Sequence, residues 1–215
     1  RPLFLKETPI VATSIETAEI IKYASNSFLA TKIAFINEVA DLCEVVGADV
    51  QQVAHAMGID NRISSKFLNA GPGFGGSCFP KDVKAFASTA KKKNIDLSII
   101  DAVNKSNNER IIKISNKIIS ILKNNSSIAF LGLSFKPNTD DVRDSTSMKI
   151  ASKLFETGHK VQCYDPQAMN NAKKENSNLD YYNSAYEACA GVSAIIIGTE
   201  WNEFRALDFK KILKL

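Results

Sequence analysis

One segment of the chain concentrates residue types that support covalent chemistry. It reads Gly71-Pro-Gly-Phe-Gly-Gly-Ser-Cys-Phe-Pro-Lys-Asp82. Its four glycines allow the main chain to approach a ligand closely and to adopt positive φ angles. Cys78 stands at the start of a predicted helix, where the helix dipole and the charge of Lys81 favour a thiolate, and Asp82 returns to the same side of the first turn. The segment predicts a nucleophilic cysteine, and a buried structural cysteine beside a tight turn is the alternative.

The other three cysteines stand in ordinary surroundings. Cys43 lies in the apolar stripe of a predicted helix, Cys163 alternates with apolar residues in a predicted strand, and Cys189 lies in a short predicted helix. The spacing of the four cysteines fits no C-x-x-C metal or redox pattern. We therefore expect these three cysteines to be structural, and we predict no metal site.

A second group of polar residues lies on one long predicted helix. Lys22 and Asn26 are four residues apart and share a face of that helix, and Asn37 returns near this face about three turns later. Polar side chains on an otherwise apolar helix need ligands or protein partners. A face exposed to solvent is the alternative interpretation.

A third segment, residues 132–144, follows a predicted strand. Ligands of open α/β sheets bind at the carboxyl ends of strands, and Lys136 and Arg143 offer positive charge to a phosphate there. The segment lacks the G-x-G-x-x-G pattern, so it does not predict an ordinary dinucleotide loop.

Helical periodicity dominates the first half of the chain. The pattern predicts one long helix over residues 13–46, with Thr13-x-x-Glu16 as a capping box and Gly47 just after its end. Three further helices are predicted at about residues 49–57, 80–93 and 98–123. We expect this helical domain to cover residues 13–124.

The pattern changes to alternating strands and helices after Asn125. Short apolar strands are predicted at residues 127–131, 160–164 and 194–197, with helices at residues 146–157 and 184–190. This order implies a parallel, doubly wound sheet. The predicted fold class is α/β overall: an all-α central domain, followed over residues 125–215 by a Rossmann-like parallel-sheet domain.

The composition is that of a globular protein. The 215 residues are 45% hydrophobic and 23% charged, and the formal net charge is +4. The lysines are spread along the chain instead of forming one basic face, so nucleic-acid binding is not predicted. The sequence shows no signal peptide and no apolar run of membrane length, so we predict a cytoplasmic location without a membrane partner.

Taken together, the motifs resemble the UDP-glucose/GDP-mannose dehydrogenase family. The motifs that carry the resemblance are Glu19-Ile-Ile-Lys22-Tyr-Ala-Ser-Asn26, Phe35-Ile-Asn-Glu38, Asp60-Asn-Arg62-Ile, Gly73-Phe-Gly-Gly-Ser-Cys78-Phe-Pro-Lys-Asp82, Gly132-Leu-Ser-Phe-Lys136-Pro-Asn-Thr-Asp-Asp-Val-Arg143 and Thr199-Glu-Trp201. They occur in the family's order and span nearly the whole chain. The members that oxidise UDP-glucose are the most similar.

The resemblance implies an oxidation in two steps. The C6 alcohol of UDP-glucose becomes a carboxylate, and two NAD⁺ molecules accept hydride. Cys78 attacks the intermediate aldehyde, and the resulting thiohemiacetal is oxidised to a thioester that water hydrolyses. By the same resemblance Lys22 stabilises the oxyanion or transfers a proton, and Asn26 positions the substrate. Asp82 assists proton movement or orients Lys22 and water.

The resemblance also implies a set of binding residues. Substrate contacts are implied for Lys22, Asn26, Arg62, Phe67, Gly73, Phe74, Gly75, Phe135 and Lys136, and NAD contacts for Lys81 and Arg143. Arg62 resembles the family arginine that reaches into the site of the neighbouring subunit. The helical domain resembles the family's homodimer core, joined through its long helix, and the α/β domain resembles the part that holds UDP.

The chain departs from the family pattern at both ends. Residues 1–12 resemble only the exit segment of an N-terminal NAD-binding domain. We expect the domain at residues 125–215 to be a truncated form of the family's UDP-binding domain, with its C-terminal end missing. We therefore expect this chain alone not to turn over substrate. Two alternatives stay open: another nucleotide-sugar dehydrogenase, such as one for GDP-mannose, or a non-catalytic dimerisation and nucleotide-binding module.

Overall fold

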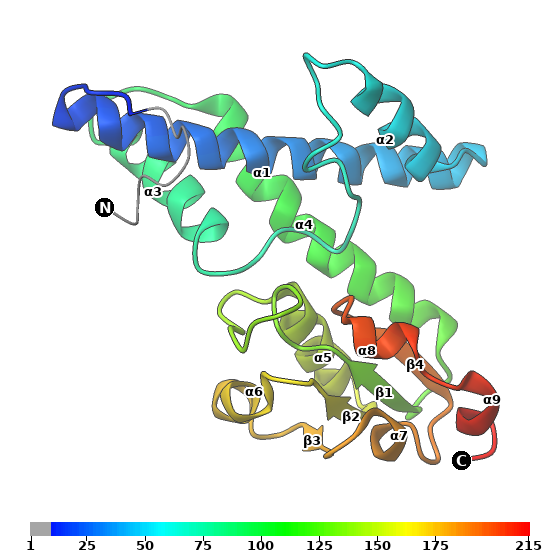
Figure 1. Ribbon diagram of the computed structural model, residues 1–215. Coiled ribbons are helices and arrows are strands. Elements are labelled where there is room, and N and C mark those ends of the chain that lie inside the picture. The colour runs from blue at the N-terminus through cyan, green and yellow to red at the C-terminus, as the bar shows by residue number, and fades with distance from the viewer. Residues whose placement is uncertain (1–9) are drawn as a thin grey trace.

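The computed structural model describes residues 10–215, which form a helical part and an α/β part (Figure 1). The helical part consists of α1 (Ile15–Val46), α2 (Val50–Ile59), α3 (Phe79–Lys91) and α4 (Ser98–Ile121). Helix α1 runs the length of this part, and α4 extends from it to the α/β part. Most of the exit segment expected at residues 1–12 lies outside the described residues.

Helix α1 follows the sequence prediction except at its first turn. Ser14 is the N-cap, and its hydroxyl accepts a hydrogen bond from the N–H of Thr17. The predicted capping box of Thr13 and Glu16 is wrong, because the residue after Thr13 takes the N-cap position. The predicted end of the helix is confirmed, since Gly47 ends it with a φ of 73°.

The helical part encloses a small apolar core. Its buried residues are Ala30 and Ala34 of α1, Val83 of α3, Val103 of α4 and Phe74 of the loop before α3. Because alanine side chains are small, neighbouring side chains pack close to the backbone of α1 here. The core therefore anchors the glycine-rich loop to α1 through one aromatic ring.

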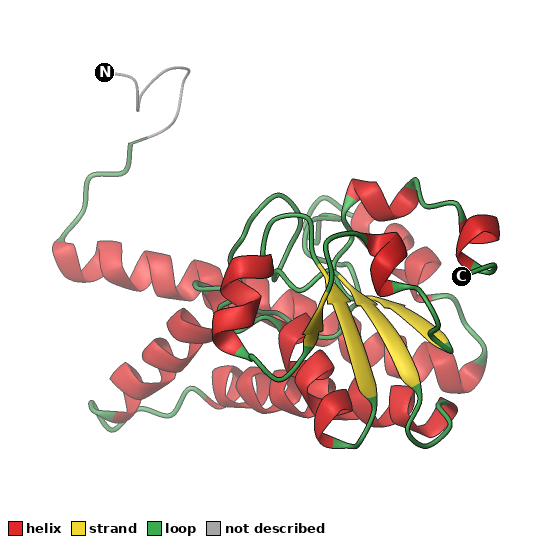
Figure 2. Cartoon of the chain, turned by 90° about the horizontal axis from the view of Figure 1, so that it is seen from below, coloured by secondary structure: helices red, strands yellow, loops and turns green. Residues whose placement is uncertain are grey.

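The α/β part is a four-stranded parallel sheet with helices on both faces (Figure 2). The strands are β1 (Ser127–Leu131), β2 (Lys160–Tyr164), β3 (Asp180–Tyr181) and β4 (Ala194–Ile197), in the order β3-β2-β1-β4. The helices are α5 (Thr146–Glu156), α6 (Met169–Glu175), α7 (Ala185–Ala188), α8 (Asn202–Arg205) and α9 (Phe209–Ile212). The predicted doubly wound fold is confirmed, whereas β3 and the short helices α6, α8 and α9 were not predicted.

Strand β1 lies between the two apolar cores of this part. Ile128 and Phe130 pack against α5 and the second half of α4, whereas Ala129 and Leu131 pack against α7 and Trp201. Alternate residues of a strand face opposite sides of the sheet, so a strand covered on both faces reads as a continuous apolar run. Helix α4 thus contributes to the sheet core as well as to the helical core.

A buried carboxylate holds the carboxyl edge of this sheet together. Asp165 follows β2, is almost fully buried, and accepts hydrogen bonds from six donors within 3.1 Å. The donors are the main-chain N–H groups of Leu133, Ser134, Gln167 and Ala168, the Ser134 hydroxyl and the Trp201 indole. A buried carboxylate needs such partners because its desolvation is costly. Asp165 therefore fixes the segments that follow β1, β2 and β4.

We expect Asp165→Asn to destabilise the fold by about 2–4 kcal/mol, because an amide has one acceptor oxygen and turns its own N–H groups toward other donors. Ser134→Ala removes only one of the six donors and should cost about 1 kcal/mol. Urea unfolding followed by circular dichroism and by the fluorescence of Trp201 measures both changes. An Asp165→Asn chain as stable as the parent would contradict this role.

Candidate active site

Cys78 lies where the glycine-rich loop becomes helix α3. It is the N-cap residue of α3, its side chain is exposed, and Pro80 occupies the first turn. The first N–H groups of a helix have no partner within the helix and carry partial positive charge. The Ser77 hydroxyl lies 3.8 Å from the sulfur. The predicted placement of Cys78 at a helix start is confirmed, and its nucleophilic role stays a prediction.

Asp82 brings together three further predicted site residues, one turn into α3. Its carboxylate is 1% exposed, and Oδ2 accepts a hydrogen bond from the Asn26 amide at 2.7 Å. The ammonium group of Lys22 lies 3.5 Å from Oδ2, and that of Lys81 lies 3.6 Å from Oδ1. Burial raises the pKa of Asp82, but the hydrogen bond from Asn26 and the charges of Lys22 and Lys81 outweigh burial and hold the pKa below its ordinary value. The carboxylate is therefore charged at neutral pH.

One oxygen of this carboxylate keeps its hydrogen-bonding capacity. Asp82 Oδ1 is buried and accepts no hydrogen bond from any residue that the structure describes. Buried polar atoms of this kind call for a functional or structural explanation, since most find a partner. The oxygen lies one turn from Cys78, and the charged group beside it is the Lys81 ammonium at 3.6 Å.

The glycine-rich loop is held by three side chains from α1 and α4. The Asn37 side-chain oxygen accepts a hydrogen bond from the Gly71 N–H at 2.7 Å, and the Arg110 guanidinium donates to the Gly71 carbonyl at 3.0 Å. The Asn107 amide forms two hydrogen bonds with the main chain of Phe74, accepting at 2.7 Å and donating at 3.1 Å. The loop is not part of a helix or strand, so these side chains take the place of backbone partners.

Sequence reasoning missed Asn107 and Arg110 as site-supporting residues. It singled out Asn37 as polar but expected it near Lys22 and Asn26, whereas Asn37 reaches the glycine-rich loop. The contacts of Asn107 and Arg110 with this loop span 33 and 39 residues of sequence, so no local pattern reveals them. The one available signal was their spacing of three residues, which places both on one face of a helix.

The loop that carries Cys78 lies directly against the α/β part. Gly76 has a φ of +85°, and a Cβ atom there would lie 2.6 Å from the Phe135 ring. Only glycine fits this approach. Arg143, in the same segment after β1, forms an ion pair with Asp141 at 2.7 Å. The hydrogen bond with Asp141 and the charge of its carboxylate raise the pKa of Arg143.

A cleft of about 770 Å³ opens between the helical part and the carboxyl edge of the sheet. Phe135 and Lys136, which follow β1, and Thr199 and Glu200, which follow β4, line one side, and the other side includes Gly73. In the order β3-β2-β1-β4, the winding direction changes between β1 and β4, and ligands of such sheets bind at this switch point. The cleft lies within the usual size range of ligand sites.

The remaining predicted residues lie around this region in different settings. Phe67 packs edge-on against Phe79, with 6.0 Å between ring centroids. Phe74 is buried in the helical core, and its main-chain N–H and carbonyl are both hydrogen-bonded to Asn107. Arg62 is 89% exposed and pairs with Asp60 at 2.6 Å, and within the described chain it is not joined to the Asp82 cluster.

Residues 10–215 contain no cluster of three or more His, Cys, Asp or Glu side chains arranged to hold a metal ion. Over the same residues, no helix is both long and apolar enough to cross a membrane.

Two family profiles match the chain, one for each of its two structural parts. Residues 16–109 match the profile described as the UDP-glucose/GDP-mannose dehydrogenase family, central domain, and residues 129–215 match the UDP binding domain of that family. The chain belongs to this family. The first match covers most of the helical part and the second covers the α/β part.

This chain aligns with about half the length of each of two curated relatives. The UDP-glucose 6-dehydrogenase of Rhizobium meliloti (strain 1021) is 50% identical over 215 residues, which are 99% of this chain and 49% of the relative. That of Rickettsia bellii (strain RML369-C) is 49% identical over 219 residues, covering 100% of this chain and 50% of the relative. The chain therefore spans about half the length of the curated relatives it matches.

Solved structures of the family share the same fold. The UDP-glucose dehydrogenase of the hyperthermophilic archaeon Pyrobaculum islandicum has a TM-score of 0.86 and is 37% identical, over 94% of this chain and 48% of that chain. The GDP-mannose dehydrogenase of Pseudomonas aeruginosa has a TM-score of 0.61 and is 27% identical, over 91% of this chain and 48% of that chain.

We expect iodoacetamide to alkylate Cys78 at least about tenfold faster than the other cysteines, because Cys78 is the one exposed thiol of the four. Cys43, Cys163 and Cys189 are buried, and burial raises the pKa of the Cys163 and Cys189 thiols. Brief labelling at neutral pH followed by peptide mapping gives the order. In guanidinium the four thiols should react at similar rates, and faster labelling of another cysteine in the folded chain would count against the assignment.

Proposed function

We propose that this chain is the catalytic half of a UDP-glucose 6-dehydrogenase, with Cys78 as the nucleophile. The observation that carries the proposal is the cluster of Lys22 and Asn26 on the buried Asp82 carboxylate, one turn from an exposed cysteine at a helix start. Residues 13–124 are proposed as the central domain and residues 125–215 as the UDP-binding domain. Because the relatives are about twice as long, the oxidation is assigned to the full-length protein.

UDP-glucose is proposed as the substrate in preference to another nucleotide sugar. Relatives named for UDP-glucose are up to 50% identical to this chain, whereas the solved GDP-mannose dehydrogenase is 27% identical and less similar in structure. The nucleotide is proposed to bind in the cleft at the β1–β4 switch point. There Lys136 offers positive charge to the diphosphate, and Phe135 and Gly73 provide surface for the sugar nucleotide.

The first oxidation requires removal of a proton from the C6 hydroxyl. Bound NAD⁺ supplies the hydride acceptor for each oxidation, and Lys81 and Arg143 are exposed cations near Cys78 that suit a dinucleotide phosphate. The Lys22 ammonium stabilises negative charge on the C6 oxygen, and the free Oδ1 of Asp82 accepts or relays the proton.

The second oxidation passes through a bond to Cys78. The sulfur adds to the aldehyde carbon, and Lys22 and Asn26 stabilise the oxyanion that forms. Loss of a second hydride from this carbon leaves a thioester. Water then adds to the thioester, the carbon–sulfur bond breaks, and the thiolate of Cys78 is regenerated with the carboxylate product. Two hydrides leave the carbon and one water is consumed over the cycle.

We expect Cys78→Ser in the full-length enzyme to lower the rate of UDP-glucuronate formation by at least about a thousandfold, because a serine alkoxide is much harder to form than a thiolate. The product is measured by chromatography with UDP-glucose and NAD⁺ in excess. Cys43→Ser, which changes a buried cysteine remote from α3, is the matched control and should keep most of the activity. A wild-type rate for Cys78→Ser would exclude covalent catalysis through this residue.

Helix α1 carries an exposed apolar seam that supports a homodimer. Ile21, Phe28, Phe35 and Leu42 recur every seven residues, and their exposed fractions are 47%, 66%, 49% and 63%. Side chains at this spacing lie along one face of a helix, in the manner of a packed helix pair. A contiguous apolar face of this length favours association. We infer that two copies pair through this seam, with Arg62 reaching the neighbouring site.

We expect the chain to sediment as a dimer at micromolar concentration, because an obligate interface along α1 buries these apolar residues. The double variant Phe28→Glu/Phe35→Glu places two carboxylates in the seam and should sediment as a monomer with unchanged helix content. Sedimentation equilibrium and circular dichroism make the two measurements. A monomeric parent chain would overturn the interface and leave Arg62 without its role across it.

A further inference from the structure

We propose that Lys32 is a positioning residue for the loop that presents Arg62 and Phe67 to the substrate, an inference that rests on the proposed function. Lys32 projects from α1, and its ammonium group donates hydrogen bonds to three main-chain carbonyls of this loop. The acceptors are those of Ile63 at 2.8 Å, Ser64 at 3.1 Å and Lys66. An ammonium group has three donors, so all of them are committed to one short segment.

The loop needs such a partner because its backbone is strained. Ser64 and Phe67 both have positive φ angles, 63° and 64°, which side chains with a Cβ atom adopt at a cost. Such conformations persist where the surrounding structure fixes them. Three carbonyl groups that would otherwise face water turn toward one cation, and this arrangement offsets the strain.

The ends of the same loop lead to two proposed substrate residues. At its start, Asp60 accepts a hydrogen bond from the Arg62 N–H at 2.9 Å and pairs with the Arg62 guanidinium. At its end, the Phe67 ring packs against Phe79, the residue that follows Cys78. Lys32 binds the segment between these ends. It therefore fixes the backbone positions from which the side chains of Arg62 and Phe67 project.

Lys32 also connects this loop to the proposed dimer seam. It lies four residues after Phe28 and three before Phe35, so all three side chains share one face of α1. The loop bound to Lys32 therefore lies beside the surface proposed to meet a second copy. Arg62 belongs to the same loop and contacts Asp60 and not the Asp82 cluster, which agrees with its proposed role across the dimer.

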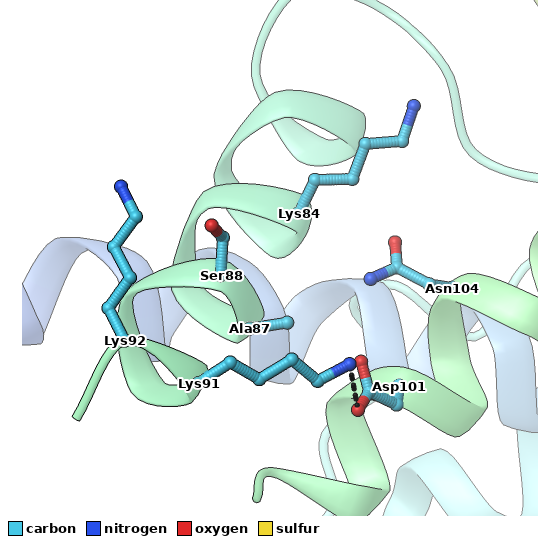
Figure 3. A pocket seen from close by; sticks show the side chains of 7 residues that line it. All are labelled: Lys84, Ala87, Ser88, Lys91, Lys92, Asp101 and Asn104. Carbon is cyan, nitrogen blue, oxygen red and sulfur yellow. Dashed lines mark ion pairs between the residues drawn. The ribbon is translucent and has the colours of Figure 1, made fainter. Parts of the chain in front are cut away.

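Three variants separate this role from the general effect of losing a lysine. Lys32→Met keeps the length of the side chain but removes its donors, and Lys32→Arg keeps the positive charge and several donors on a longer, planar head group. Lys92→Met is the matched control, because the Lys92 side chain is exposed and forms no hydrogen bond or ion pair with any described residue, while its main-chain N–H donates to Ser88 in parent and variant alike. Figure 3 shows Lys92 at the end of α3, in a hollow of about 520 Å³, pointing away from the pair formed by Lys91 and Asp101.

Limited trypsin digestion of this chain tests the hold on the loop without any assay of activity. Trypsin cleaves after Arg62 and Lys66, which both lie in the loop. Cleavage at these two bonds should be at least about fivefold faster in Lys32→Met than in the parent, because fewer contacts oppose local opening. Lys32→Arg and Lys92→Met should be cleaved at the parent rate, and thermal unfolding should show that all variants are folded. If Lys32→Met does not fold, Lys32→Gln replaces it.

Steady-state kinetics of the full-length enzyme test the consequence for the substrate. Lys32→Met should raise the KM for UDP-glucose at least about fivefold and change kcat less than about twofold, since binding is weakened uniformly while the cysteine chemistry is retained. Lys32→Arg should restore most of the loss. Unchanged loop cleavage, or unchanged KM with faster cleavage, would overturn the positioning role. Failure of the parent enzyme to oxidise UDP-glucose would instead overturn the proposed function, whatever the cleavage rates.

Discussion

A carboxylate that is removed from water needs hydrogen-bond donors and positive charges close to it. Asp82 of α3 obtains them largely from α1, so the carboxylate holds these two helices together. The hydrogen bond from Asn26 joins residues that are 56 positions apart in the sequence, and Lys22 lies on the same face of α1 as Asn26. Separation of α1 from α3 would leave a buried, uncompensated charge, which is strongly destabilising. The same contact fixes the distance between Cys78 and the polar groups of α1, so the packing of the helices and the geometry of the site are one constraint.

The glycine-rich loop meets a complementary requirement, because its peptide groups lie outside helices and strands. Side-chain amides of Asn37 and Asn107 and the Arg110 guanidinium satisfy the peptide groups of Gly71 and Phe74. Two of these residues come from α4, which also packs against the sheet core. Rigid support from a helix shared by both parts explains how the loop remains aligned with the cleft at the edge of the sheet.

The sequence predicted the features that depend on local patterns. The buried strands read as apolar runs, and the position of Cys78 followed from a glycine-rich stretch that gives way to helical periodicity. Strand β3 was missed because two residues cannot show a period, and the capping box was assigned one residue too early because Thr13 and Ser14 are both suitable N-caps. Asn107 and Arg110 act through distant main-chain groups, and Asp165 joins the nearby N–H groups of Gln167 and Ala168 to the distant Leu133, Ser134 and Trp201. Distant contacts of this kind leave no trace in spacing.

The two edges of the sheet differ in a way that affects the handling of this chain. Strand β3 is two residues long and offers little backbone to another molecule. Among residues 10–215, β4 pairs with a strand on one side only, and it consists of Ala194, Ile195, Ile196 and Ile197. No charged residue or proline interrupts this strand, and natural sheets use such residues to discourage pairing between molecules. In concentrated solution, the backbone of β4 is therefore the place at which ordered aggregation of this chain would begin.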